Sequence, residues 1–300
     1  MKFSVTNKSY TKIRKSIINS INITVKKSPQ ENVYANVKRL KWINEELENF
    51  MREKAVPKKN IKILDVGCGT GDMITKPLAL TGYSITGIDT DKESIKHAKI
   101  EPQNAEFLAG TLESIDKKYD VIICSEVLEH LSTPETLLEE INERVKPNGI
   151  ILLTTPNGYG WFEVEKFIYE KAGLGKLINL TLGNVRRGAV WLYWNSGAKN
   201  LRDKLRKKTF VPAPTEQNSL KEHDVHLQHF TIKSLNKLFF KAGLNPIKWR
   251  GSSLMAGPIS NWLLRNFPRA LNLNTTVADH LPIKLASGWY VVLTKNNKKS

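Results

Sequence analysis

Short hydrophobic runs, each bounded by glycine, proline or polar residues, recur between residues 61 and 155. The five runs are "IKILDVG", "YSITGID", "AEFLAG", "YDVIICS" and "GIILLTT". Segments with the helical spacing of apolar residues lie between them, at 91–98 and 134–145. Alternation of buried strands with helices is typical of a parallel sheet covered by helices on both faces. The pattern therefore predicts an α/β fold with a doubly wound, Rossmann-like sheet.

Helical periodicity also precedes and follows this core. Residues 32–53 predict one amphipathic helix, an N-terminal helical extension of the core. Its apolar face consists of Val37, Leu40, Ile43, Leu47 and Phe50. A further helix is predicted to start at Thr231, as N-cap, and to end at Gly243 in the left-handed conformation. The last apolar run, "GWYVVLTK", predicts a closing strand.

The periodicity is weakest between residues 160 and 217, where aromatic clusters and the basic run "KNLRDKLRKK" replace it. Such a segment is more typical of an inserted cap than of a continued sheet. We therefore expect four units along the chain. They are an N-terminal helical extension (1–60), a ligand-binding core (61–159), an inserted cap (160–217) and a C-terminal part with a substrate-side elaboration (218–300).

The composition indicates a protein of the reducing cell interior. Of the 300 residues, 40% are hydrophobic, which is enough to bury a sizeable core. Two cysteines, Cys68 and Cys124, are too few for a disulfide scaffold. No apolar run approaches the length of a membrane span, and the basic N-terminus lacks the apolar stretch of a signal peptide. We expect a cytoplasmic protein.

The net charge of +17 is concentrated outside the predicted core. Residues 61–155 carry −7, whereas residues 1–60 carry +9 and residues 156–300 carry +15. All seven tryptophans also lie outside residues 61–155. The basic flanks indicate either a lysine-rich source organism or an anionic partner, such as a membrane surface, a phosphate-bearing substrate or nucleic acid.

The segment "KILDVGCGTGD" ends a predicted strand with an acid, followed by Gly67, Gly69 and Gly71. Such glycines can adopt positive φ and let a ligand approach the backbone closely, next to a helix N-terminus. Their spacing places the third glycine one residue earlier than the dinucleotide fingerprint does. Asp89 ends the next strand about twenty residues later, where ribose hydroxyls would need an acceptor. Together these features indicate a nucleotide-like ligand.

Four segments in this order resemble the class I S-adenosylmethionine-dependent methyltransferases. They are "DVGCGTGD", "GIDTD", "YDVIICSEVLEHL" and "VKPNGIILLTTPN". The "EVLEHL" form and "HLQHFTIKSLNKLFFKAGL" are similar to the branch that includes the ubiquinone-biosynthesis O-methyltransferases and many small-molecule and glycan methyltransferases. The resemblance covers 61–160 well and 220–250 moderately. It implies that S-adenosyl-L-methionine is the cofactor and that the chain is a methyltransferase.

The resemblance also implies which residues bind the cofactor. They are Arg39, Asp65, Gly67, Gly69, Gly71, Asp89, Thr90, Thr111, Leu112 and Ser125. Asp65 and the first two glycines are expected at the methionine part, and Asp89 at the ribose. Thr111 stands where many relatives have an Asp that accepts from the adenine amino group, and Leu112 is expected to pack on the ring. Arg39 resembles an arginine that meets the cofactor carboxylate.

A hydroxyl acceptor needs alignment, exclusion of water and usually a base. His130 follows the fourth predicted strand, and His226 and His229 lie in a segment that enters a loop over the substrate in the family. Each is a candidate for the catalytic base, and the alternative is that they cap helices or bond loop backbone. "HDVHLQH" repeats histidine every third residue, which places the outer two about 240° apart on a helix. We expect no metal.

The acceptor is less constrained by the sequence. "TPNG" lacks the signature N/D-P-P-Y/F of exocyclic-amine methylation of bases, and "ISNWLLRNFPRAL" suits either an interfacial helix or a cap helix over the site. We expect O-methylation of a small, lipid-linked or glycan acceptor, with peripheral contact to the inner face of the membrane. The alternatives are an RNA or protein methyltransferase using the basic flanks, and a non-catalytic cofactor-binding scaffold. The oligomeric state stays open.

Overall fold

The computed structural model describes residues 33–100, 105–161, 165, 167, 227–255, 260 and 268–296. Nearly all of the expected cap, and most of the "ISNWLLRNFPRAL" segment, lie outside these residues. The expectations for both, like the four-unit division of the chain, therefore stay predictions.

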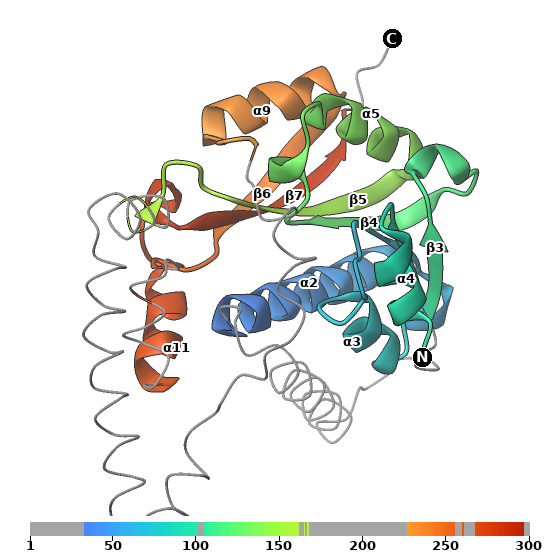
Figure 1. Ribbon diagram of the computed structural model, residues 1–300, viewed down its shortest axis with the longest axis horizontal. Helices are drawn as coiled ribbons and strands as arrows, with labels where there is room; N and C mark the ends of the chain where they lie inside the picture. The colour runs from blue at the N-terminus through green and yellow to red at the C-terminus, as the bar shows by residue number, and fades with distance from the viewer. Residues whose placement is uncertain are drawn as a thin grey trace, which may run out of the picture.

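A single seven-stranded sheet in the order β3-β2-β1-β4-β5-β7-β6 forms the centre of the described structure (Figure 1). The strands are β1 (Lys62–Val66), β2 (Ser84–Asp89), β3 (Ala105–Ala109), β4 (Tyr119–Ser125), β5 (Val145–Pro156), β6 (Leu244–Gly251) and β7 (Gly288–Lys295). β1 to β5 pair in parallel, and β7 lies antiparallel to both β5 and β6. All five predicted core strands and the closing strand are confirmed, as is the doubly wound sheet.

Helices cover both faces of this sheet, with α5 and α9 on one side and α2 and α3 on the other (Figure 1). The helices are α2 (Val33–Lys54), α3 (Thr75–Leu80), α4 (Lys92–Ala98), α5 (Pro134–Arg144), α9 (Ile232–Lys241) and α11 (Pro268–Val277). Short 3-10 turns are η1 (Lys58–Asn60), η2 (Leu112–Ser114), η3 (Leu128–His130) and η4 (Ile283–Leu285). The predicted helices before, within and after the core are therefore confirmed.

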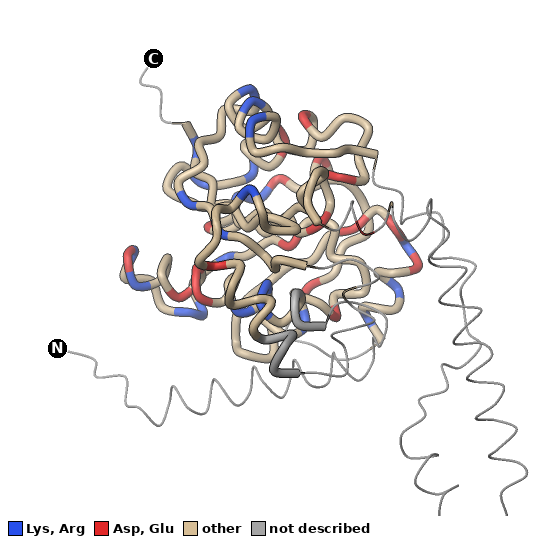
Figure 2. Tube along the Cα trace, turned by 90° about the vertical axis from the view of Figure 1, so that its left-hand side faces the viewer, with Lys and Arg blue, Asp and Glu red and all other residues tan. Residues whose placement is uncertain are grey.

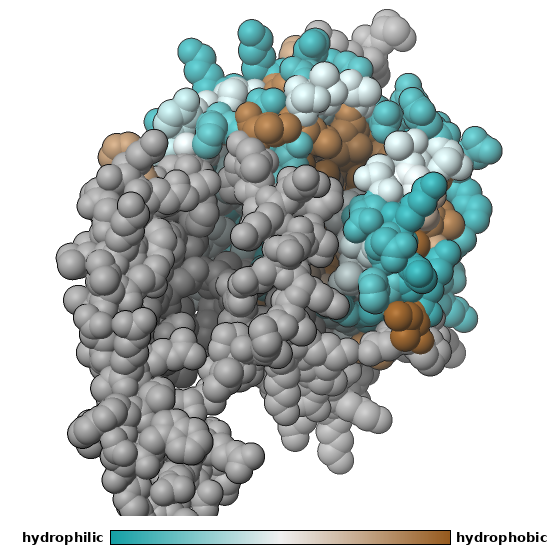
Figure 3. Space-filling model, viewed as in Figure 1, coloured by the Kyte–Doolittle hydropathy of each residue, from teal (hydrophilic) through white to brown (hydrophobic). Residues whose placement is uncertain are grey.

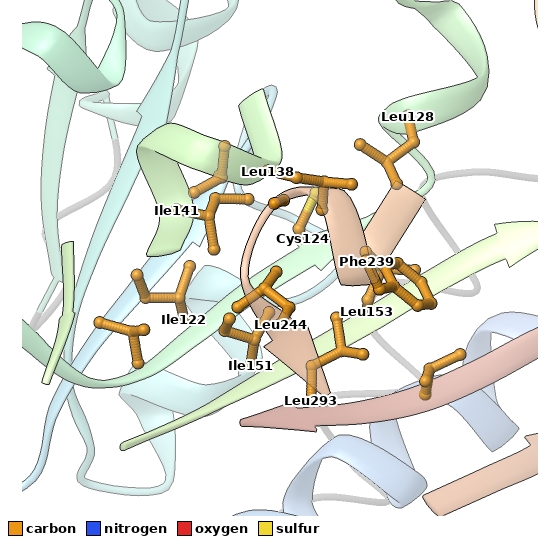
Figure 4. Packing of buried hydrophobic residues seen from close by; sticks show 14 of the residues in the cluster. Ile122, Cys124, Leu128, Leu138, Ile141, Ile151, Leu153, Phe239, Leu244 and Leu293 are labelled. Carbon is orange, nitrogen blue, oxygen red and sulfur yellow. The ribbon is translucent and has the colours of Figure 1, made fainter. Parts of the chain in front are cut away.

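The central strands bury both of their faces because successive side chains point to opposite sides. In β4, Ile122 and Cys124 pack toward α5 and α9, as Figure 4 shows. The alternate residues Val121 and Ile123 belong to a second cluster beneath α2. Burial on both faces explains why the predicted strands are nearly continuous apolar runs rather than alternating ones.

The ends of two helices follow from their local sequences. The Asp91 side chain accepts hydrogen bonds from the backbone of Glu93 and Ser94 and so caps α4. Thr231 and Ser234 form a reciprocal capping box at the start of α9. Gly243, after α9, has φ +70°, as predicted for a left-handed terminal residue.

β5 begins before the predicted run "GIILLTT", because the preceding stretch "KPNG" also lies inside the strand. Val145 already pairs with Tyr119, and the register then shifts before Ile150 pairs with Val121. The extra residues form an irregularity that Gly149 permits, because a Cβ there would lie 2.6 Å from the carbonyl oxygen of Asp120. The strand therefore starts directly after the helix.

Hydrophilic residues dominate the visible surface of the described part, and its hydrophobic residues form small patches (Figure 3). Acidic and basic residues are interspersed along its trace (Figure 2). The described residues contain 24 Lys and Arg against 21 Asp and Glu, so most of the +17 net charge belongs to the remaining residues. Within the described residues, no helix has the length and apolarity needed to cross a membrane.

Candidate functional site

The candidate site lies where the strand order reverses, between β1 and β4. In open parallel sheets, ligands bind at the carboxyl ends of the strands at such a switch point. The glycine turn follows β1 there, and Ser125 and Glu126 follow β4 on the neighbouring strand. The sequence placed both segments at strand ends, and the sheet brings those ends together.

The three glycines of the turn all have positive φ: +70° for Gly67, +53° for Gly69 and +75° for Gly71. A Cβ at Gly67 would lie 2.5 Å from Val127, and one at Gly71 would lie 2.6 Å from the Phe107 ring. A Cβ at Gly69 would meet no atom within 4 Å. The outer glycines therefore allow close protein packing, while open space lies over the middle one, where a ligand can approach the backbone.

Asp89 binds this turn across the sheet edge. Its Oδ2 accepts a hydrogen bond of 2.7 Å from the backbone N–H of Gly69, and its Oδ1 accepts one of 2.9 Å from that of Asp91. Each carboxylate oxygen retains a lone pair for a further donor. The acid at the end of β2 therefore fixes the turn and remains able to accept from a ligand hydroxyl, at the position that the sequence predicted.

Asp65, at the end of β1, is 2% exposed and accepts a hydrogen bond of 2.5 Å from the Thr75 hydroxyl. Burial raises the pKa of Asp65 to about 7, against the hydrogen bond from Thr75 and the positive charge of Arg39, while the charge of Asp89 adds to the rise. Asp65 therefore changes charge near neutral pH.

The expected helix N-terminus beside the turn is more distant than the sequence suggested. α3 begins only at Thr75, four residues after Gly71, and has six residues. The Lys76 backbone N–H donates to the Gly71 carbonyl oxygen, and the Gly71 N–H donates to that of Cys68. The turn is therefore closed by its own backbone bonds and by Asp89.

Arg39 reaches the same site from α2, far away in sequence. Its side chain is 14% exposed, and its guanidinium lies 3.5 Å from Glu126 Oε1 and donates to Asn36 Oδ1 at 2.6 Å. Its positive charge also acts on Asp65. The structure thus brings Arg39 to the end of β4, where its charge acts on Asp65. The contact of Arg39 with a cofactor carboxylate stays a prediction.

The residues expected at the adenine and ribose lie farther along the same edge. Thr90 and Thr111 are exposed, and the Thr111 carbonyl oxygen accepts from the backbone and hydroxyl of Ser114. Leu112 is 2% exposed and packs in the hydrophobic core. Ser125 shares a hydrogen bond of 2.8 Å with the Thr154 hydroxyl. Their contacts to a cofactor stay predictions.

Two acids after β4 form a group that sequence analysis missed. Glu126 has φ +56°, a strained value for a non-glycine residue, and it accepts a hydrogen bond of 2.7 Å from the Thr154 hydroxyl. Glu129 is 1% exposed and its Oε2 accepts from the Thr155 hydroxyl at 3.3 Å. Among the described residues, its Oε1 has no hydrogen-bond partner. Two acids directly after a strand, in "SEVLEHL", were the available signal.

Burial raises the pKa of Glu129 well above its usual range, and the charge of Glu126 raises it further. His130 lies beside this carboxyl, with Nε2 3.9 Å from Glu129 Oε1. A buried carboxyl that lacks one partner, next to an imidazole, is an arrangement that can accept or hold a proton.

His229 is exposed and lies on a segment attached to the same acid group. The backbone N–H groups of Leu227 and Gln228 donate to the Glu129 carbonyl oxygen at 2.8 and 3.0 Å. Gly158 lies against the His229 backbone, where a Cβ would be 2.5 Å from the His229 Cα. The structure therefore brings the backbone of His229 to the segment that carries His130.

His226 lies outside the described residues, so its position stays a prediction. Within the part of the chain that the structure describes, no three His, Cys, Asp or Glu side chains are grouped so as to hold a metal ion.

These groups suit a ligand that carries charges of both signs and a diol. Asp65 and Asp89 offer carboxylate acceptors beside an open stretch of backbone at Gly69, and Arg39 offers a cation within the same edge. The acid group after β4 lies beside these residues, because β4 pairs with β1 and Glu126 contacts Arg39.

Comparisons with known proteins agree with this description. The model of a family described as a methyltransferase domain matches residues 39–248. The ubiquinone biosynthesis O-methyltransferase of Rickettsia prowazekii is 36% identical over 125 residues, which cover 40% of this chain and 48% of that protein. The protein of the same name from Pelagibacter ubique is 34% identical over 127 residues, covering 40% of this chain and 52% of its own. The chain thus spans about half the length of the curated relatives it matches.

Solved structures of methyltransferases are also similar to this chain. Magnesium protoporphyrin IX methyltransferase from Synechocystis, solved with bound SAH, has 12% identity and a TM-score of 0.47, over 86% of this chain and 84% of that one. A TehB-like SAM-dependent methyltransferase from Corynebacterium glutamicum has 15% identity and a TM-score of 0.42, over 85% of this chain and 94% of that one.

Proposed function

The chain belongs to the family of class I methyltransferase domains, whose methyl donor is S-adenosylmethionine, and we propose that it methylates an oxygen atom of a small, lipid-linked or glycan acceptor. The observation that carries the proposal is the glycine turn, with open space over Gly69 and Asp89 bonded beside it. The name of the curated relatives, ubiquinone biosynthesis O-methyltransferase, supports an oxygen acceptor and a ubiquinone precursor as the first compound to test.

The residues of the site fit this cofactor. Arg39 would pair with its carboxylate, Asp65 with the turn backbone would hold the methionine part, and Asp89 would accept from the ribose hydroxyls. Thr111 is exposed and would lie at the adenine end, whereas Leu112 is buried in the core. Bound there, the cofactor supplies an activated methyl group on a sulfonium. What the chain must add is alignment of the acceptor, exclusion of water and removal of the acceptor's proton.

We assign proton removal to His130 first. An acceptor hydroxyl would give its proton to the imidazole, and the neighbouring Glu129 carboxyl, 3.9 Å from His130 Nε2, would stabilise the resulting cation when ionised. His229 is the second candidate because it follows Leu227 and Gln228, whose backbone N–H groups donate to the Glu129 carbonyl oxygen, and His226 is the third. Loss of kcat in His130→Gln, with unchanged affinity for S-adenosylhomocysteine, would support the assignment. The same pattern in His229→Gln or His226→Gln alone would instead assign proton removal to that histidine.

The acceptor and the location are proposals of the same kind. The basic flanks and the segment "ISNWLLRNFPRAL" support peripheral contact with the inner face of an anionic membrane, in a cytoplasmic protein. Cosedimentation of the full chain with anionic and with neutral vesicles tests that contact. RNA protection that persists at high salt, without vesicle binding, would instead favour an RNA methyltransferase.

The decisive experiment is calorimetric titration of the full chain with S-adenosylmethionine, S-adenosylhomocysteine and NADH. Saturable binding of the first two, weakened at least about tenfold in Asp89→Ala, is expected because the variant loses the ribose acceptor. Turnover would then be sought with ubiquinone precursors, lipid fractions and glycans. Binding without turnover on any acceptor would favour a non-catalytic scaffold, and binding of NADH alone would refute the methyltransferase function.

A further inference from the structure

Four charged residues form an ion cluster where α2, β6 and the chain after α11 meet. We call this cluster, Lys38, Glu45, Arg250 and Asp279, the latch. Asp279 accepts from Arg250 through both carboxylate oxygens, at 2.9 and 3.0 Å, and pairs with Lys38 Nζ at 2.9 Å. Arg250 also donates to Glu45 at 3.0 Å. Lys38 and Glu45, which both lie on α2, are thus linked to each other through Asp279 and Arg250.

Lys38 is the most buried member of the latch. Its side chain is 10% exposed, and its Nζ also donates to the Thr275 carbonyl oxygen on α11 at 2.7 Å. Burial lowers the pKa of Lys38, against the hydrogen bond and charge of Asp279. Burial alone would raise the pKa of Asp279, but hydrogen bonds from Arg250 and Lys38 bring it below its usual value. Loss of the Asp279 charge would leave a buried ammonium without its main partner.

The latch acts on the helix segment that carries Arg39. Apolar packing holds α2 against the sheet, since Leu40, Ile43 and Phe50 are buried. Lys38 and Arg39 are neighbours on this helix, and their side chains bond in different directions, Lys38 to α11 and Asp279 and Arg39 to Glu126. The ionic bond on Lys38 therefore adds to the packing in fixing the rotation of the helix at the residue next to Arg39.

Three of the four latch residues lie outside the segment that matches the methyltransferase-domain family. That match covers 39–248, whereas Lys38 precedes it and Arg250 and Asp279 follow it. Lys38 and Arg250 lie within two residues of the ends of that match, on α2 and β6, whereas Asp279 lies well beyond it. The latch therefore gives a role to a residue of the chain after α11, which the match does not cover.

We propose that Asp279 is a positioning residue for the cofactor site: through Lys38 it holds α2 so that Arg39 lies beside Glu126 at the end of β4. This inference rests on the proposed function, because it assigns Arg39 to the cofactor carboxylate. Asp279 pairs with Lys38 and Arg250, so its effect on cofactor affinity passes through Arg39.

A double-mutant cycle on cofactor affinity tests this. Calorimetry with S-adenosylhomocysteine is run on the wild type, Asp279→Asn, Arg39→Gln and the double variant. We expect Asp279→Asn to weaken binding about fivefold and Arg39→Gln about tenfold, and the double variant to equal Arg39→Gln alone, because residues that act through one another are not additive. Independent, multiplying losses would overturn the proposal.

Lys38→Met is the second variant, since it breaks the latch but leaves Asp279 paired with Arg250. It should weaken binding like Asp279→Asn. The matched control is Lys248→Gln, which removes another ion pair to α2, with Glu46, and should leave affinity unchanged. Affinity unchanged in both latch variants, or an equal loss in the control, would overturn the proposal.

Hydrogen exchange of the ligand-free protein gives a readout that needs no cofactor. In Asp279→Asn, amides of residues 36–42 should exchange faster while those of β1 and β4 do not, and Lys248→Gln should match the wild type. Faster exchange throughout the sheet would show a general loss of stability and would overturn the positioning role. A wild type that binds no S-adenosylhomocysteine would refute the proposed function instead.

Discussion

The glycine turn after β1 and the acid group after β4 lie at the same edge of the sheet but are built in different ways. The turn consists of neighbours in sequence, bonded backbone to backbone, with Asp89 only one strand away. The acid group takes its partners from distant parts of the chain: Arg39 from α2, Thr154 and Thr155 from β5, and Leu227 from the segment before α9. A local motif can be recognised in sequence, whereas an assembled one depends on the whole fold.

The largest expected effect is on stability, and it differs between two glycines of the turn. Gly71→Ala forces a Cβ to 2.6 Å from the Phe107 ring at a φ of +75°, so we expect a loss of about 2–4 kcal/mol in the free energy of unfolding. Gly69→Ala meets open space, so only the left-handed strain of about 1–2 kcal/mol applies. Urea unfolding measures both.

Binding should rank the two variants differently. Gly69→Ala, although the milder for stability, should abolish measurable S-adenosylhomocysteine binding because its methyl group enters the space over the turn. A Gly69→Ala variant that binds normally would show that this space does not receive the cofactor.

The next effect concerns charge rather than shape. Asp65 has a pKa of about 7 in the folded protein, above its unfolded value of 3.8. Its contribution to stability is present at low pH and is lost as pH rises toward and through 7, since ionising the buried acid is costly. Asp65→Asn should therefore be relatively more stable at pH 8 than at pH 5, by about 1–3 kcal/mol against the wild type.

Thermal unfolding at the two pH values measures this difference, and Asp120→Asn, at an acid placed at the opposite end of β4, serves as the control. An identical pH dependence of wild type and Asp65→Asn would place the ionisation of Asp65 well below neutral pH. Glu129, whose pKa is also raised by burial, remains in both proteins and cancels from the comparison.

The smallest expected effect on stability comes from a substitution near the acid group after β4. Thr231→Ala removes the cap of α9, directly after the segment that bonds Glu129, and should cost about 1 kcal/mol of stability. Affinity for S-adenosylhomocysteine should stay unchanged because the Thr231 cap bonds Ser234 of α9 and not the glycine turn, while turnover should fall. Thr231→Ser retains the cap oxygen and should behave as wild type in unfolding and turnover assays.

The sequence predicted the sheet, its helices and the glycine turn because each has a local cause. Apolar runs bounded by turn residues, the capping side chains of Asp91 and Thr231, and glycines at positive φ act among near neighbours. It missed the start of β5 at Val145, because that depends on pairing with Tyr119 across the sheet. It also placed the helix after the turn too close, since the residues from Gly71 to Thr75 close on themselves before α3 begins.

By itself, the sequence determined the fold class and the glycine turn after β1, since these follow from short-range sterics and hydrogen bonding. Only the tertiary structure decided that Glu129 is buried beside His130, with an Oε1 that has no hydrogen-bond partner among the described residues, and that Lys38 and Asp279 meet across 241 positions of chain. Burial and long-range ion pairing arise when remote segments exclude water from one another, and no local pattern of residues records that.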